Sequence, residues 1–202
     1  MRARSFGPRA VLLECEGAAE VRAAYAEARR RREAGELSCT DIVPAATTVL
    51  LDGLADPRSV TATLDVWPNE PADDEDGELV ELAVTYDGPD LDSVARHTGL
   101  DVDEVVRRHR ETEFVVAFCG FAPGFAYLTG LPEELEVPRL EDPRSSVPTG
   151  SVGLAGRFTG VYPRSSPGGW QLIARTEETL WDLDRDPPAV LTPGTRVRFT
   201  DG

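Results

Sequence analysis

The feature that most constrains the fold is a glycine- and proline-rich stretch, residues 114–170, that also carries many aromatic side chains. It holds nine of the eighteen glycines and seven of the sixteen prolines of the chain. Glycine permits positive φ and close backbone approach, whereas proline fixes φ near −65° and lacks an N–H donor. A disordered linker of this composition would lack the large apolar residues. The stretch therefore predicts ordered loops packed on a β scaffold, which is where sites are usually built.

Short strands surround this stretch. Apolar and polar side chains alternate along residues 80–86, which is typical of a half-buried strand. Three further strands are predicted at 113–118, 171–174 and 195–200, and two short helices at 90–97 and 101–110. In the second helix, Asp101 and Glu104 have the spacing of a capping box. Many short strands joined by irregular loops indicate a β-barrel.

The first part of the chain has a different pattern. It predicts, in order, a strand at 10–13, a helix at 20–34, paired strands at 42–43 and 47–51, and a helix that begins at Asp56-Pro57. The order β-α-β-β-α suggests a ferredoxin-like α+β domain. An acidic, proline-containing segment follows it. We therefore predict a small α+β domain at 1–70, an acidic linker at 71–78 and a mainly β domain at 79–202.

Composition excludes several classes of function. The 36 acidic and 21 basic residues give a net charge of −15, which repels nucleic acids and anionic membranes. The basic residues are all arginine, so the chain cannot carry biotin on a lysine, form a Schiff base or supply a P-loop lysine. Three scattered cysteines and two histidines argue against disulfides and against a metal site. Without a membrane-length apolar run or a signal-peptide core, the protein is predicted to be cytoplasmic.

Several motifs in the glycine-rich stretch resemble the signature of one family. They are Gly120-Phe121-Ala122-Pro123-Gly124-Phe125-Ala126-Tyr127-Leu128, Pro143-Arg144, Val147-Pro148, Gly150-Ser151-Val152, Thr159-Gly160-Val161-Tyr162-Pro163 and Ser166-Pro167-Gly168-Gly169-Trp170. The family comprises the B subunit of bacterial 5-oxoprolinase, the sporulation kinase inhibitor KipI, allophanate hydrolase subunit 1 and one half of the carboxyltransferase domain of urea carboxylase. The motifs are specific for the family but do not distinguish its members.

The resemblance implies a cyclophilin-like barrel for the second domain. It also implies a component of an ATP-dependent 5-oxoprolinase, which opens the lactam of 5-oxoproline to glutamate together with a homologous C subunit and an A subunit. ATP, with Mg²⁺, is expected at the level of the complex, with no cofactor covalently bound to this chain. Because the sequence has no Walker loop or kinase signature, the chain is expected to be inactive alone.

Two alternatives remain open. One is a KipI-like inhibitor that binds a sensor histidine kinase, and the other is an amide-processing subunit of the allophanate hydrolase or urea carboxylase type. Adjacent genes for the A and C subunits would favour the 5-oxoprolinase, whereas a nearby sensor kinase without them would favour the inhibitor.

The candidate anion-binding residues lie late in the stretch. Gly168-Gly169 offers two adjacent N–H groups that can curl into an anion-binding nest, and Ser166 and Trp170 flank the pair as in the family. Arg144 and Arg164 each follow a proline, which can hold a guanidinium toward a carboxylate or phosphate. Surface arginines paired with the many acids are an equal alternative. We expect the loops at 121–127 and 162–170 to converge on one face of the barrel.

The candidates for proton transfer are His109 and Tyr162. The spacing of His109 on its helix favours a hydrogen-bonded, half-buried histidine, but a histidine recurs before the corresponding strand in family members. Tyr162 is expected to pack in the barrel, with a catalytic role as the alternative. Cys119 ends an apolar strand, which favours a structural thiol over a nucleophile. Phe158 stands where many relatives have glutamine. Arg139 and Ser151 are weaker candidates.

Overall fold

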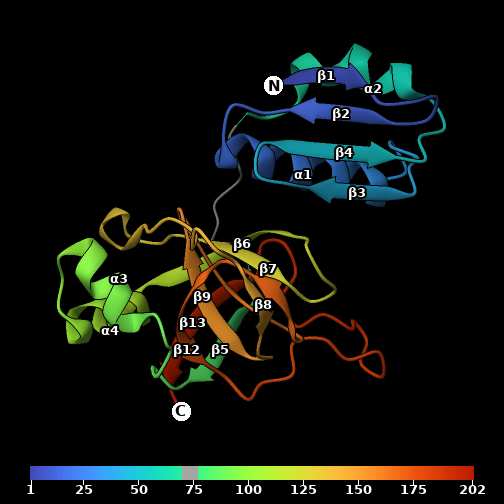
Figure 1. Cartoon of the computed structure of the whole chain (residues 1–202). Coiled ribbons are helices and arrows are strands. Elements are labelled where there is room, and N and C mark those ends of the chain that lie inside the picture. Colours follow the sequence, from blue (N-terminus) through green and yellow to red (C-terminus); the bar gives the residue numbers. More distant parts are fainter. Residues whose placement is uncertain (70–76) are drawn as a thin grey trace. The chain divides into compact units, whose positions relative to one another are not determined.

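The computed structural model describes residues 1–69 and 77–202 (Figure 1). The chain divides into two compact units, Met1–Asp76 and Gly77–Gly202. The predicted linker at 71–78 lies outside the described residues except for its last two. None of the helices in the described ranges is long and apolar enough to cross a membrane.

The first unit is a four-stranded antiparallel sheet with two helices (Figure 1). Its strands are β1 (Arg2–Ser5), β2 (Val11–Glu14), β3 (Asp41–Pro44) and β4 (Thr48–Asp52), and its helices are α1 (Ala18–Glu33) and α2 (Pro57–Thr63). The sheet order is β1-β2-β4-β3, so β4 lies between β2 and the strand that follows α1. The inward side chains of β2 and β4, such as Leu13 and Leu51, pack on the alanine-rich face of α1.

The strand β1 was not predicted from the sequence. Its four residues, RARS, are polar or small and show no apolar alternation, so they carry no strand signal. They form a strand because β2 offers an open edge, along which Arg2–Ser5 pair with Glu14–Val11. The predicted α+β class is correct, and the ferredoxin-like topology stays a prediction.

The second unit is a seven-stranded sheet that curls into a barrel. Its strands are β5 (Leu79–Val84), β6 (Glu113–Cys119), β7 (Ala126–Thr129), β9 (Ser151–Ala155), β10 (Phe158–Val161), β12 (Gln171–Arg175) and β13 (Arg196–Asp201). The order is β12-β9-β10-β7-β6-β13-β5. Thr85, just after β5, and Arg175, at the end of β12, exchange two backbone hydrogen bonds of 2.8 and 2.9 Å. These bonds join the two edge strands at one point, so the sheet is nearly closed.

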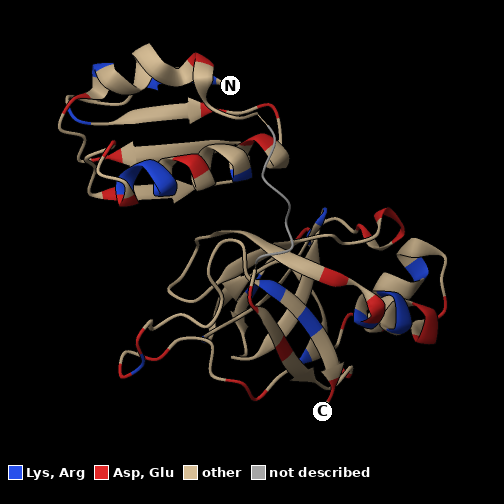
Figure 2. Cartoon of the chain, turned by 180° about the vertical axis from the view of Figure 1, so that it is seen from behind, with Lys and Arg blue, Asp and Glu red and all other residues tan. Residues whose placement is uncertain are grey.

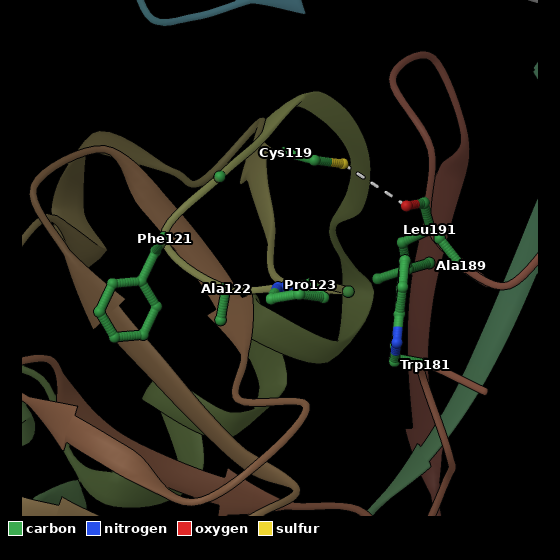
Figure 3. Close-up of a pocket in the computed structure, with 9 residues that line it drawn as sticks. Cys119, Phe121, Ala122, Pro123, Trp181, Ala189 and Leu191 are labelled. Carbon is green, nitrogen blue, oxygen red and sulfur yellow. Dashed lines mark hydrogen bonds between the residues drawn. The ribbon is translucent and has the colours of Figure 1, made fainter. Parts of the chain in front are cut away.

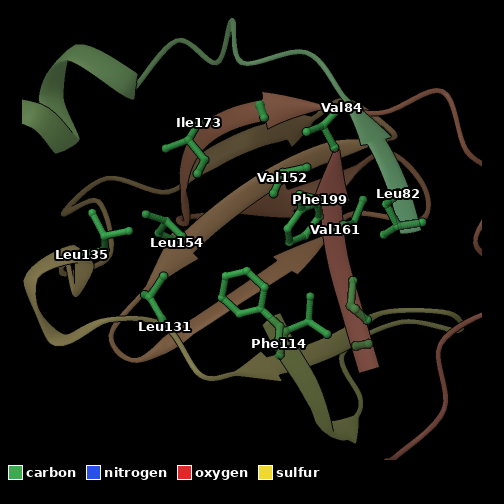
Figure 4. Packing of buried hydrophobic residues seen from close by; sticks show 14 of the residues in the cluster. Leu82, Val84, Phe114, Leu131, Leu135, Val152, Leu154, Val161, Ile173 and Phe199 are labelled. Carbon is green, nitrogen blue, oxygen red and sulfur yellow. The ribbon is translucent and has the colours of Figure 1, made fainter. Parts of the chain in front are cut away.

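Large aliphatic and aromatic side chains fill the barrel (Figure 4). Phe114 and Phe199 face each other from β6 and β13, with ring centroids 5.6 Å apart. On β7, β9 and β12, neighbouring residues belong in turn to this core and to a second, aromatic cluster, as Leu154 and Ala155 do on β9. Because neighbouring side chains of a strand point to opposite faces, the second cluster lies on the outer face of the barrel wall.

Two helices, α3 (Leu91–Thr98) and α4 (Val102–Glu111), lie between β5 and β6. The first ends at Gly99, whose φ of 74° is the left-handed cap that glycine favours. The second is capped by Asp101, whose carboxylate accepts the Glu104 N–H at 2.8 Å, while the Glu104 carboxylate pairs with Arg107 and Arg108, so one half of the predicted capping box forms. Both helices contribute apolar residues to the barrel core, including Val94 and Val105.

A separate two-stranded sheet covers the aromatic cluster. It pairs β8 (Arg144–Val147) with β11 (Ser166–Gly168) in antiparallel register, with Ser166 opposite Val147 and Gly168 opposite Arg144. Four of the residues singled out in the sequence therefore lie in this two-stranded layer, which we call the β8–β11 layer, or next to it. This layer positions the candidate site.

Candidate functional site

An aromatic cluster connects the two predicted loops. Phe125 contacts the rings of Tyr162 and Trp170, each at a centroid distance of 5.3 Å. Phe121 lies 5.3 Å from Phe125 and 6.2 Å from Tyr162. The predicted convergence of the loops at 121–127 and 162–170 on one face of the barrel is therefore confirmed.

Two glycines of the barrel wall make room for Trp170. A Cβ atom on Gly153 would lie 3.0 Å from the Trp170 Cβ, and one on Gly160 would lie 3.1 Å from its Cζ3 and 2.8 Å from the Ala126 carbonyl. The indole thus rests directly on the wall backbone. Phe158 extends the cluster by edge contacts of 5.7 Å to both Phe118 and Tyr127, so at this position an aromatic side chain fills space in the cluster.

Tyr162 is buried beneath the β8–β11 layer, and its hydroxyl points at Gly168. A Cβ on Gly168 would lie 2.4 Å from that hydroxyl oxygen. Burial raises the pKa of Tyr162, and this shift is opposed by a backbone hydrogen bond from Trp170 and by the nearby charges of Arg139 and Arg144. The side chain is therefore a neutral phenol at neutral pH, able to donate one hydrogen bond. Its proposed role in proton transfer stays a prediction.

Gly168 and Gly169 do not form the nest that the sequence suggested. Neither has a φ in the left-handed region, which an alternating nest requires. Gly168 is instead a strand residue, and its missing side chain is explained by the close approach of Tyr162. At Gly169 a Cβ would meet only ordinary contacts of 3.6 Å, and its carbonyl accepts the Leu140 N–H at 2.8 Å.

Arg144 is already paired within the chain. Its Nη2 donates to the Asp90 carboxylate at 2.6 Å, and its Nη1 donates to the Trp170 carbonyl at 3.4 Å. The other carboxylate oxygen of Asp90 accepts the Leu172 N–H at 2.7 Å. Arg144 thus ties β8 to the start of α3 and to β12. A role in binding a substrate anion stays a prediction, and the structure gives this guanidinium a structural partner.

Arg164 and Ser166 follow Tyr162 in the chain, and the polar groups of both side chains are without a partner in the part of the chain that the structure describes. The Arg164 side chain is exposed and makes no hydrogen bond or ion pair with any residue in the described ranges. The Ser166 hydroxyl is buried without a partner among those same residues. A buried hydroxyl of this kind calls for a water molecule or a ligand group. Of the predicted anion-binding residues, these two are the ones whose side-chain groups are unpaired.

His109 occupies a different place, inside the barrel core. It has no exposed surface and stacks on Phe199 at 4.7 Å. The Thr159 hydroxyl donates to the Gly153 carbonyl at 3.2 Å, so its oxygen accepts from His109 Nε2 at 3.0 Å. Nδ1 then accepts the Tyr86 hydroxyl proton at 2.8 Å. Both ring nitrogens are used, so the predicted hydrogen bonding is confirmed, whereas the predicted half-burial is wrong because the imidazole is fully buried.

Burial lowers the pKa of His109 to about 3, from an ordinary value of 6.5. As the pH falls below 6.5 the unfolded chain takes up this proton first, so the stability that neutral His109 provides is lost progressively toward pH 3. Replacing His109 by glutamine removes this dependence. We expect the stability advantage of the wild type over His109→Gln to narrow by about 2 kcal/mol between pH 6.5 and pH 5.

Urea unfolding of both proteins across this pH range measures the effect. His97→Gln, at the exposed second histidine on α3, is the control for exchanging an imidazole for an amide. A constant difference between wild type and His109→Gln across the range would contradict the buried, neutral imidazole.

An open cavity of about 430 Å³ lies beside the aromatic cluster (Figure 3). One wall is the loop at 119–124, and the other is formed by Trp181, Ala189 and Leu191. Trp181 and Ala189 pair as a backbone bridge, which makes 181–189 a small hairpin. A Cβ on Gly124 would lie 2.7 Å from the Trp181 Cβ, so this glycine lets the hairpin approach the loop.

Cys119 lines this cavity as a thiol. Its Sγ donates to the Leu191 carbonyl at 3.5 Å (Figure 3), and burial raises its pKa to about 11. A thiol with so high a pKa is a poor nucleophile at neutral pH, which supports the predicted structural role. Trp181 was not among the residues predicted from the sequence to form a site. The signal that was available is a group of large apolar residues, Leu180, Trp181 and Leu183, within an otherwise acidic segment.

Phe121 stands out in the loop that borders the cavity. Its φ is 66°, and it is the one non-glycine residue with positive φ within residues 1–69 and 77–202. This conformation costs about 1 kcal/mol or more for a bulky side chain. Its ring is nevertheless 60% exposed. Phe121 therefore combines a strained backbone conformation with an aromatic side chain that is mostly exposed to solvent.

The fold and the site define a class of protein in which a small α+β unit precedes a mainly β barrel with an aromatic outer face. The chain belongs to the family of carboxyltransferase domains, subdomain C and D, whose model matches residues 1–191.

Curated relatives in this family are 5-oxoprolinase components. The chain is 49% identical over 136 residues to the B subunit of 5-oxoprolinase from Escherichia coli O157:H7, covering 66% of this chain and 62% of that protein. It is 47% identical over 124 residues to the B subunit of 5-oxoprolinase from Bacillus subtilis strain 168, covering 60% and 52%. The matched region thus spans less than two thirds of the length of either relative.

Solved structures share the fold. The crystal structure of TTHA0988 has a TM-score of 0.78 at 34% identity, covering 96% of this chain and 40% of that chain. The urea amidolyase of Kluyveromyces lactis has a TM-score of 0.71 at 19% identity, covering 99% of this chain and 15% of that chain. At that identity the second likeness concerns the fold alone.

Proposed function

We propose that this chain is the B component of an ATP-dependent 5-oxoprolinase, which converts 5-oxoproline to glutamate together with an A and a C subunit. The observation that carries the proposal is the 49% identity to a protein named as the B subunit of 5-oxoprolinase, over a region that spans 66% of this chain. For the fold, the order of the strands in each sheet fits a ferredoxin-like first unit and a cyclophilin-like second unit.

The site geometry supports a need for partners. His109 is sealed in the core, Cys119 is a half-buried thiol with a raised pKa and Tyr162 is a neutral phenol. None of them is paired with a general base that would make it a nucleophile, so the described residues offer a binding surface and lack a complete reaction centre. Opening a stable lactam is unfavourable without coupling, and ATP with Mg²⁺ supplies that driving force when bound to the complex.

The unpaired polar groups fit an anionic ligand. In the proposed division of labour, the Arg164 guanidinium and the Ser166 hydroxyl bind a carboxylate or a phosphate oxygen, and Tyr162 donates a proton or a hydrogen bond. Gly168 keeps the Tyr162 hydroxyl in place. Arg144 orients the β8–β11 layer through its ion pair with Asp90, while the A and C subunits provide the remaining chemistry.

Reconstitution tests the proposed function. The chain, purified alone and together with the A and C subunits encoded in the same genome, is assayed for 5-oxoproline-dependent ATP hydrolysis and glutamate formation. We expect turnover from the complete mixture, and background rates from the lone chain and from the mixture that lacks it.

Two outcomes would contradict the proposal. Robust turnover by the lone chain would contradict its dependence on partners. No 5-oxoproline-dependent turnover from the complete mixture would contradict the substrate, and urea-derived amides and inhibition of a sensor histidine kinase would then be assayed with the same preparations.

A further inference from the structure

Phe121 lines the cavity described above and is 60% exposed. The hairpin at 181–189, whose residues Trp181 and Ala189 line the other wall, carries a second exposed large apolar residue, Leu183, which is 81% exposed. The cavity walls include the apolar residues Ala122, Pro123 and Leu191 (Figure 3). We call Phe121, the cavity walls and this hairpin the Phe121 surface. Exposed apolar groups gathered beside a cavity mark an interaction site.

The Phe121 ring is held from below and left open above. Its contacts with Phe125 and Tyr162 fix the ring on the aromatic cluster, so little rotamer freedom would be lost on binding. Its left-handed backbone is the strained conformation that functional sites retain. A pre-organised aromatic ring beside an open apolar cavity has the properties of a hot spot in a protein interface.

The hairpin gives this surface a charge. Asp184 and Asp186 are exposed on it, Asp182 follows the cavity-lining Trp181, and Glu178 is exposed on the approach to it, whereas Glu177 pairs with Arg175 at 3.1 Å. Acidic residues are red in Figure 2. The Arg185 side chain donates to the Thr179 carbonyl at 3.3 Å, so the one cation of the hairpin is turned back onto its own chain. The apolar cavity is therefore bordered by negative charge.

We propose that the Phe121 surface docks a protein partner that inserts an aliphatic or aromatic side chain into the cavity and places Lys or Arg residues against the hairpin. The cavity is open to solvent, whereas small-molecule pockets enclose most of their ligand. Charge complementarity selects a basic surface over an acidic one. The proposal rests on the proposed function in taking that partner to be another component of the complex.

The test compares the affinities of variants for the A and C subunits by calorimetry. Phe121→Gly loses the ring contacts with Phe125 and Tyr162 but also relieves the backbone strain, so the two effects offset each other and this variant should unfold close to the wild-type temperature. We expect its affinity for the docking partner to fall on the order of thirtyfold, the effect of losing one interface anchor. Asp184→Arg should also weaken binding, and high salt should weaken wild-type binding.

Phe6→Ala is the matched control, because Phe6 is 59% exposed on the first unit and lies outside the Phe121 surface. It should bind like the wild type. If the wild type binds one of these partners and Phe121→Gly binds it equally well, this surface assignment is overturned while the proposed function stands. If the wild type binds neither of them, both are overturned.

Discussion

Replacing Gly168 by alanine should destabilise the second unit by about 3 kcal/mol, the upper end of the range for overpacking a core. The added Cβ would lie 2.4 Å from the Tyr162 hydroxyl oxygen and 3.0 Å from two of its ring carbons. Tyr162 cannot retreat, because its ring is packed against Phe125 and Trp170. Either the β8–β11 layer lifts from the barrel or the tyrosine leaves the cluster. In both cases 5-oxoproline turnover by the reconstituted complex should fall with it.

Gly169→Ala is the matched control one residue further along the chain. Its φ is not left-handed and its Cβ would make contacts of 3.6 Å, so we expect a change within about 0.5 kcal/mol. Thermal unfolding of the three proteins, with activity expressed per folded molecule, measures both effects. Equal melting temperatures for Gly168→Ala and Gly169→Ala would show that the Tyr162 contact does not constrain this position.

Replacing Asp90 by alanine should lower the free energy of unfolding of the second unit by about 2–4 kcal/mol. The change leaves the Arg144 guanidinium without its carboxylate and the buried Leu172 N–H without an acceptor. The value is set below that of a fully buried pair because 28% of the Arg144 side chain is exposed to solvent. Asp90→Asn, which keeps an acceptor for the N–H, should lose less.

Asp87→Ala is the control for removing a carboxylate near by. Asp87 pairs with Arg175 at 2.9 Å, but both side chains are about half exposed, so its loss should cost less than about 1 kcal/mol. A double-mutant cycle of Asp90→Ala with Arg144→Ala then separates the energy of the ion pair from that of the Asp90–Leu172 hydrogen bond. If Asp90→Ala and Asp87→Ala lower the free energy of unfolding by the same small amount, the Asp90–Arg144 pair does not hold the β8–β11 layer in place.

Local structure was largely predictable because its causes are local. The Asp56 and Asp101 caps, the Gly99 terminus and the hairpin of β3 and β4 each follow from residues within a few positions of one another. The strands between residues 126 and 168 were not predicted from the sequence. Their glycines hide the alternation, because Gly153 and Gly160 stand where outward-facing side chains would show it.

The candidate site was predicted in part. The convergence of the two aromatic loops followed from their motifs, and Gly168 was correctly marked as special, whereas Gly169 has room for a Cβ atom. The reason given, an anion-binding nest, was wrong, since Gly168 is required by the Tyr162 hydroxyl and not by a left-handed backbone. That contact joins Tyr162, just after β10, to Gly168 in β11, and neither segment alone has a signature for it.

By itself, the sequence determined the family, the two-part organisation and the absence of lysine chemistry, because motifs, periodicity and composition can all be assessed along the chain. Only the tertiary structure decided the state of each polar side chain. Asp90 has the sequence position of a helix cap, yet its carboxylate turns to Arg144 and Leu172. The hydrogen bonds of His109 and the exposed ring of Phe121 likewise depend on neighbours distant in sequence. Burial and pairing are properties of the packed barrel. They decide whether a polar group is charged or neutral, and whether an aromatic side chain is packed in the core or exposed for binding.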